Sequence, residues 1–321
     1  MNEIACPRCR RPNRQGARYC ATCGYELAVS PERGNDEQPT RPAGAPIGED
    51  LTQSLSDAPA RPSYSFHVGS MSDIGRERET NEDSMLVLDL HCANKSVNRA
   101  AGLFVVADGM GGQEGGEIAS GMLVRSLARL AAAEWLPGVV DDTRKLPDPG
   151  AWLISAIQRA NAEIYGWAYE AGYEMGTTVV AALVAGNHAL VAHVGDSRAY
   201  RVGAGGIEQL TVDHSLVESL VMANQISREE ARTHPQANVI YRTVGDQPQV
   251  VVDLTEIELA IGERLLLCSD GLSGMLADGE IRRGVMAETS PQAACEALIA
   301  AANEAGGGDN CSVILIDLKS P

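Results

Sequence analysis

The sequence predicts an α+β protein built from two antiparallel sheets with helix pairs packed outside them. Two observations support this prediction. Short apolar strand patterns follow one another from residue 64 to residue 318, and apolar residues recur at helical spacing between them. A helix or a sheet with one apolar face must bury that face against another layer. The sheets are therefore expected inside and the helices outside.

The expected elements follow the chain in order. An alternating pattern predicts a first strand at 64–69, and a second follows at 85–88. Two runs of apolar residues at helical spacing come next and predict two helices. A Ser-Pro pair at 290–291 then predicts the first turn of a further helix, which stops at Gly306. The apolar faces of the two stripes are Ile118, Met122, Ser126, Leu127 and Leu130, then Leu153, Ile157, Ala160, Ile164 and Trp167. Further strands are expected at 103–107, 178–184, 189–194, 198–202, 264–268 and 311–315.

Composition excludes several classes of protein. The chain has 321 residues and a formal net charge of −17. So much negative charge disfavours a nucleic-acid surface and suits hard divalent cations. No apolar run reaches the roughly 20 residues of a membrane span, and the first residues carry no apolar signal core. We expect a cytoplasmic monomer without a membrane partner.

Four of the eight cysteines lie in two CxxC pairs close to the N-terminus. Each pair presents two thiolates on a tight turn, and two such turns make a closed tetrahedral zinc site. Redox-active or randomly placed cysteines are the alternative. Residues 1–27 resemble small bacterial zinc ribbons, and a segment this short needs its metal in order to fold. The expected ligands of one structural Zn²⁺ are Cys6, Cys9, Cys20 and Cys23.

The next segment, residues 28–63, loses aromatic residues and gains Pro, Gly, Ser and acids. With so little apolar content it cannot offset the entropy of becoming ordered. We predict a flexible linker there, followed by one folded domain at 64–319. Arginines make residues 1–27 locally basic, so binding to nucleic acid or to an acidic partner is an alternative to a simple docking module.

Three acids share one local pattern. Asp108 and Asp270 each end an apolar strand and are followed by glycine, and Asp309 follows a glycine run and precedes the last strand. A strand that ends in this way delivers a carboxylate to the rim of a sheet with no bulky neighbour. No His or Cys lies beside these acids, so their oxygens favour Mg²⁺ or Mn²⁺ over zinc.

A wider set of motifs carries a family resemblance over residues 64–318. In this order and rough spacing, the chain resembles the metal-dependent PPM/PP2C protein phosphatases. That resemblance implies a four-layer α-β-β-α sandwich. The motifs are Arg78, Asn81-Glu82-Asp83, Asp108-Gly109-Met110-Gly111-Gly112, Gly176-Thr177-Thr178, Gly195-Asp196-Ser197-Arg198-Ala199-Tyr200, Asp270-Gly271 and Asp309-Asn310.

The resemblance also implies roles for residues. Asp108 would bridge two Mn²⁺ or Mg²⁺ ions, with the Gly109 carbonyl as a further ligand, and Asp270 and Asp309 would hold the second ion. Glu82 and Asp83 would bind or orient water on the metals. Asp196 would reach a third ion together with Asp270, although an acid that anchors a turn is an equal alternative. Arg78 would clamp phosphate oxygens, unless it only pairs with Glu79 or Glu82. Arg78 and Asp108 are thus the expected catalytic residues.

One position departs from many eukaryotic relatives, which carry a proton-donating histidine where this chain has Met110. Bacterial relatives share the methionine, so water on the metal is expected to act as the acid. His214 is an alternative donor, but we expect a structural turn there, and we expect His193 to belong to the core or a sheet face. Residues 216–245 lie where relatives carry a flap. There, Arg228 and Arg232 are expected to pair with Glu229 and Glu230 or to face solvent, and attraction of a phosphopeptide is the alternative.

Three functions compete. The first is a phosphatase that hydrolyses phosphoserine and phosphothreonine on proteins by attack of metal-bound water, and that opposes a bacterial Ser/Thr kinase. Phosphorylated proteins, including the kinase and its substrates, are then the partners. The second is a catalytically weak phosphoprotein-binding adaptor, which the intact Asp108, Asp270 and Asp309 argue against. The third is a zinc-ribbon-led regulatory protein, which the overall acidity disfavours.

Overall fold

A computed structural model describes residues 3–5, 12–14, 64–94, 97–111, 115–141, 144 and 146–319. The chain divides into two units, residues 1–44 and 45–321. In the first unit, β1 (Glu3–Ala5) and β2 (Pro12–Arg14) form an antiparallel pair with Glu3 opposite Arg14. The four cysteines expected to bind zinc and the expected linker at 28–63 lie outside the described residues.

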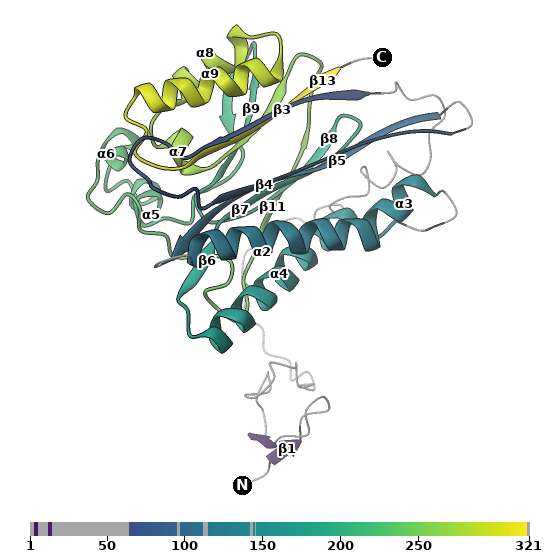
Figure 1. The fold of residues 1–321 in the computed structure, drawn as a ribbon, viewed down its shortest axis with the longest axis vertical. Helices are drawn as coiled ribbons and strands as arrows, with labels where there is room; N and C mark the ends of the chain where they lie inside the picture. Colours follow the sequence, from purple (N-terminus) through teal and green to yellow (C-terminus); the bar gives the residue numbers. More distant parts are fainter. Residues whose placement is uncertain are drawn as a thin grey trace, which may run out of the picture. The chain divides into compact units, whose positions relative to one another are not determined.

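Two antiparallel sheets form the centre of the second unit (Figure 1). One sheet has the strand order β11-β8-β7-β5-β4, with β6 paired to the end of β5, and the other has the order β10-β9-β12-β13-β3. The first contains β4 (Asp83–Asn94), β5 (Val97–Gly111), β6 (Met175–Thr177), β7 (Val179–Ala185), β8 (His188–Val194) and β11 (Asp253–Glu258). The second contains β3 (Ser65–Asp73), β9 (Arg198–Gly203), β10 (Gly206–Gln209), β12 (Arg264–Cys268) and β13 (Cys311–Lys319).

Helices cover the outer face of each sheet (Figure 1). The six-stranded sheet carries α2 (Gly115–Leu130), the π-helical turn η1 (Ala131–Trp135), α3 (Leu136–Val140) and α4 (Pro149–Ala171). The five-stranded sheet carries α8 (Asp278–Ala287) and α9 (Pro291–Glu304). Three short helices follow α4 and precede α8 in the sequence: α5 (Leu216–Met222), α6 (Arg228–Arg232) and α7 (Asp270–Ser273). The predicted α+β sandwich is confirmed.

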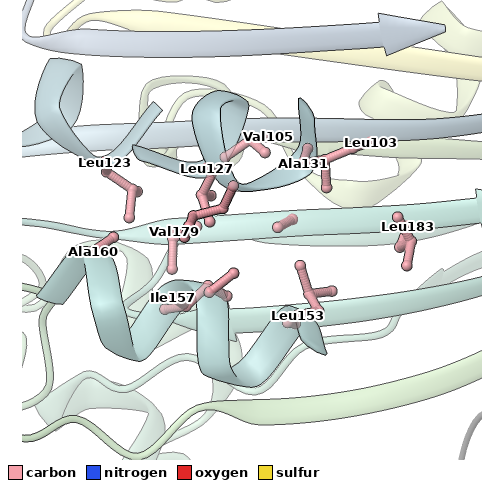
Figure 2. Packing of buried hydrophobic residues seen from close by; sticks show 14 of the residues in the cluster. Leu103, Val105, Leu123, Leu127, Ala131, Leu153, Ile157, Ala160, Val179 and Leu183 are labelled. Carbon is pink, nitrogen blue, oxygen red and sulfur yellow. The ribbon is translucent and has the colours of Figure 1, made fainter. Parts of the chain in front are cut away.

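Three apolar clusters separate the four layers. The first joins α2 and α4 to one face of β5 and β7, where Leu123, Leu127 and Ile157 meet Val105 and Val179 (Figure 2). The second fills the space between the two sheets, and the third joins α8 and α9 to the five-stranded sheet. Because each helix buries one stripe only, burial of these stripes fixes which face of each helix meets the sheet.

The predicted apolar stripe of α4 is correct except at its end. Leu153, Ile157, Ala160 and Ile164 are fully buried, whereas Trp167 is 38% exposed. Trp167 lies in the last turns of α4, and its ring packs at 5.5 Å against that of Tyr173 instead of the core. Within the described residues, no helix is both long and apolar enough to cross a membrane.

Candidate metal centre

Both sheets contribute acids to one place. Asp83 is the first residue of β4 and lies opposite Asp108 on β5. Asp270 starts α7 directly after β12, and Asp309 lies two residues before β13. Asp196 lies in the turn between β8 and β9. The charge of Asp270 acts on Asp108, Asp83 and Asp196, so these carboxyl groups are close neighbours.

Close backbone contacts explain the glycines that follow two of these acids. A Cβ on Gly109 would lie 2.1 Å from the carbonyl oxygen of Gly116 at the start of α2. A Cβ on Gly271 would lie 2.0 Å from the carbonyl oxygen of Asn310. Only a residue without a side chain fits at such distances, so the Asp-Gly pairs reflect tight packing around the acids.

Hydroxyl groups hold the Asp108 backbone. The Asp108 amide donates to Oγ1 of Thr178 at 3.1 Å, and the Asp108 carbonyl accepts from the Thr178 amide at 2.8 Å. The Thr178 hydroxyl in turn lies 2.6 Å from that of Ser197, the residue after Asp196. This chain of contacts connects the two acids through buried side chains.

The same crowding shifts the acid–base properties of the carboxyl groups. Burial, followed by the negative charges of Asp270 and Asp309, raises the pKa of Asp83 to about 7. Burial first, and neighbouring carboxylates second, also raise the pKa of Asp108, Asp196 and Asp270. Carboxylates that lose water and face one another disfavour their charged forms. A cation among them would remove that penalty.

Three carboxylate oxygens provide a test of whether a metal fits. Asp83 Oδ1, Asp196 Oδ1 and Asp270 Oδ1 are each buried and have no hydrogen-bond partner. An acceptor buried without a partner costs about 1–3 kcal/mol, so such atoms are normally satisfied by a group outside the protein chain. The ligand atoms offered here are oxygens only, which suits Mg²⁺ or Mn²⁺. The residues present therefore fit divalent cations.

Arg78 is the positive charge nearest to these acids. Its Nη2 donates to Asp309 Oδ2 at 2.7 Å, and 49% of its side chain is exposed. It does not form the ion pair with Glu79 or Glu82 that the sequence left open. The charges of Glu82 and Asp108 also stabilise the guanidinium and help raise its pKa. Arg78 therefore stands at the rim of the acidic cluster with further N–H groups facing solvent.

Two histidines form a separate cluster with Asp253: His193 lies on β8 opposite Asp253 of β11, and His214 contacts the same carboxylate. His214 Nδ1 accepts from the Gly195 amide at 3.0 Å, and His193 Nε2 lies 2.9 Å from the Val212 carbonyl. Their rings stack at 4.7 Å, and Asp253 completes a group with spacing suitable for a metal. Arg242 already donates to Asp253 at 2.9 Å, so a guanidinium supplies the positive charge there.

The expected pairing of Arg228 and Arg232 with Glu229 and Glu230 is wrong, although both arginines are exposed as the alternative expectation had it. Arg228 donates to both oxygens of the buried Glu218 on α5, at 3.2 and 3.1 Å. Arg232 donates to the carbonyl oxygens of Ser273, Gly274 and Leu276, which end α7 and the turn after it. Neither arginine pairs with Glu229 or Glu230, whose place in the first turn of α6 is explained by the Ser227–Glu230 capping box.

Sequence reasoning assigned no role to Ser269 or Asn310, although both contact these acids. The Ser269 hydroxyl donates to Asp83 Oδ2 at 2.8 Å. Asn310 accepts from the Glu82 amide and donates to the carbonyls of Ile74 and Thr80, so it fixes the loop that carries Arg78. Each is adjacent in sequence to a predicted site acid, Asp270 or Asp309, and this adjacency could have indicated a role at the site.

Buried carboxylate oxygens without hydrogen-bond partners, with an arginine at their rim, suit a metal-dependent enzyme that acts on phosphoryl groups. The family model described as Protein phosphatase 2C matches residues 79–303. The chain therefore belongs to the protein phosphatase 2C family, and it is a protein serine/threonine phosphatase.

Individual relatives agree with this assignment. The protein phosphatase PhpP of Streptococcus pneumoniae is 34% identical over 256 residues, which cover 79% of this chain and 98% of PhpP. The Mycobacterium tuberculosis serine/threonine phosphatase PstP/Ppp matches with a TM-score of 0.67 and 36% identity, covering 78% of this chain and 98% of that structure. A structure of the PstP catalytic domain in complex with two manganese ions matches with a TM-score of 0.66 and 34% identity, covering 80% and 99%.

Proposed function

We propose that this phosphatase works with two divalent cations, Mn²⁺ or Mg²⁺, held by Asp108, the Gly109 carbonyl, Asp270 and Asp309. The observation that carries the proposal is Asp270 Oδ1, a buried carboxylate oxygen without a hydrogen-bond partner, beside the unpartnered oxygens of Asp83 and Asp196. The two manganese ions of the related PstP structure support it. Glu82 and Asp83 orient water beside the ions, and Asp196 offers its unpartnered oxygen to a third ion together with Asp270.

Divalent ions in such a site supply Lewis-acid polarisation of a phosphoryl group and lower the pKa of water. The chain itself binds and orients the substrate. One nitrogen of Arg78 donates to Asp309, and the remaining N–H groups of the guanidinium donate to phosphoryl oxygens of phosphoserine or phosphothreonine. Met110 has no proton to donate, and both ring nitrogens of His214 are engaged, Nδ1 by the Gly195 amide and Nε2 by Asp253. The leaving oxygen therefore takes its proton from water.

The substrates we propose are phosphorylated proteins, among them a Ser/Thr kinase and its targets. The names of PhpP and PstP/Ppp, which are given as phosphatases, support an enzyme over a binding adaptor. We also keep the zinc ribbon as a proposal. The β1–β2 pair supports it because the first CxxC, Cys6 to Cys9, lies in the connection between these two strands. Reduced thiols suit the cytoplasm, where we place a monomeric protein.

Metal dependence is tested with p-nitrophenyl phosphate and a phosphothreonine peptide in Mn²⁺, Mg²⁺ or EDTA. Wild type is compared with Asp108→Ala and Asp270→Ala, and Asp246→Ala serves as a matched control at an exposed acid. We expect turnover that needs a metal and falls more than about 100-fold in the two site variants, because loss of even an outer partner of a metal ligand costs about 10–100-fold. Equal turnover in all four proteins, or turnover in EDTA, would contradict the proposed centre.

A further inference from the structure

Ser269 differs from the other serines that precede helices in this fold. Ser215, Ser227 and Ser290 each accept a hydrogen bond from an amide in the first turn of the helix that follows. Ser269 precedes α7 in the same way, but its side chain makes no such bond. Its hydroxyl is therefore used for something other than capping.

The hydrogen bonds of Ser269 have a fixed direction. The Ser312 amide donates to Ser269 Oγ at 2.9 Å, so this oxygen acts there as an acceptor. The one hydroxyl proton of Ser269 then goes to Asp83 Oδ2 at 2.8 Å. Ser269 is fully buried, so bulk solvent does not reach its hydroxyl.

This bond crosses from one sheet to the other. Asp83 begins β4 in the six-stranded sheet, whereas Ser269 follows β12 and Ser312 lies on β13 in the five-stranded sheet. The charges of Asp270, which follows β12, and of Asp309, which precedes β13, repel Asp83. The Ser269 hydroxyl, held by the Ser312 amide of β13, donates to Asp83 beside these acids, and together with the Ser312 side chain it counters the rise in the pKa of Asp83.

The consequence concerns which oxygen of Asp83 is available. Because Oδ2 accepts from Ser269, rotation of the carboxylate is restricted and Oδ1 is left buried and without a partner. Partners of this kind fix the orientation of metal-binding groups, and their loss typically costs about 10–100-fold in metal affinity. We propose that Ser269 is a positioning residue for the metal centre, which orients Asp83 through its hydroxyl and thereby sets the affinity for divalent cations.

This inference rests on the proposed metal centre, and full-length protein tests it. Mn²⁺ binding is measured by calorimetry, and the Mn²⁺ concentration for half-maximal activity is measured with p-nitrophenyl phosphate. Ser269→Ala removes the donor, and Ser269→Thr keeps it. Ser290→Ala is the matched control, since it removes the hydroxyl of the serine before α9 that accepts from the Ala293 amide. Melting temperatures in EDTA show that each variant is folded.

We expect Ser269→Ala to bind Mn²⁺ about tenfold more weakly and to need about tenfold more Mn²⁺ for activity, with an unchanged KM for the phosphate ester at saturating metal. Ser269→Thr should bind as wild type does, and Ser290→Ala should lower the melting temperature only. If Ser269→Ala binds Mn²⁺ as wild type does, the positioning role is wrong. If wild type itself binds no Mn²⁺, the proposed metal centre fails instead.

Discussion

Asp83 is the acid through which pH acts most clearly on the metal-free protein. Its pKa is about 7 in the folded protein, against about 3.9 in an unfolded chain. Between these values the folded state binds more protons than the unfolded state. The free energy of unfolding contributed by this group is therefore largest below about pH 4 and falls as pH rises from about 4 to 7.

This leads to a prediction for Asp83→Asn in EDTA. The amide removes the buried charge, so the variant should melt at least about 4 °C above wild type at pH 7.5, and the difference should shrink toward zero near pH 4.5. Burial lowers the pKa of His193 and His214, which destabilises both proteins in acid. The difference between the two proteins is therefore the quantity to measure, by calorimetry. A difference independent of pH would contradict the shifted pKa.

Sequence reasoning at the residue scale found the acids but not their partners. Asp108, Asp270 and Asp309 could be recognised because strand, acid and glycine are adjacent in the chain. The partners are distant: Ser269 lies 186 residues from Asp83, and Asn310 lies 228 residues from Glu82. A single sequence carries no periodicity that connects residues so far apart.

Among the elements, α6 is attached to α7, the helix that begins at Asp270. Arg232 donates to three carbonyl oxygens at the end of α7 and beyond it, and α7 begins at Asp270. Arg228 fixes α6 to α5 through Glu218. The flap at 216–245 is thus joined to the residues around Asp270 by a guanidinium, which can bond several carbonyls at once.

Replacing Arg232 with Met should loosen the flap. We expect a loss of about 1–2 kcal/mol in stability, at the low end for bonds from a charged donor because the side chain is exposed. We also expect faster cleavage by trypsin after Arg228 and Arg242, the sites in residues 216–245 that the variant keeps. Arg283→Met is the control, because Arg283 makes only a long contact of 3.8 Å with Glu280 and is 74% exposed. Limited proteolysis followed by mass spectrometry locates the cuts. Equal cleavage rates in both variants would show that Arg232 does not hold the flap.

Element positions were more predictable than element contacts. The strands predicted at 178–184, 189–194 and 198–202 occur as Val179–Ala185, His188–Val194 and Arg198–Gly203. Their apolar runs and turn residues are local signals. The partners of Arg228 and Arg232 have no such local signal. An exposed helix with both signs of charge suggests ion pairs between its own residues, whereas here both arginines bond to groups of α5 and of the end of α7.

At the scale of the whole molecule, the two predicted kinds of metal site differ in the ligand atoms that they offer. Residues 1–27 offer four thiols, while the phosphatase domain offers carboxylates. Thiolates select zinc and carboxylates select Mn²⁺ or Mg²⁺. Among the residues that the structure describes, the apolar clusters of the phosphatase domain are formed by residues 64–318. Zinc binding and phosphatase activity should therefore be separable within the full chain.

We predict one zinc per chain in wild type, measured by elemental analysis after purification without added metal. Cys6→Ser and Cys20→Ser should each lose most of this zinc, because a four-cysteine site requires all its ligands. Both should keep kcat/KM for p-nitrophenyl phosphate in Mn²⁺ within about twofold of wild type, since less than 0.5 kcal/mol of transition-state stabilisation is then affected. Cys92→Ser, at a free and partly exposed thiol, is the control. Wild type without zinc would disprove the ribbon, whereas zinc loss that also abolishes turnover would show that residues 1–27 are needed for catalysis.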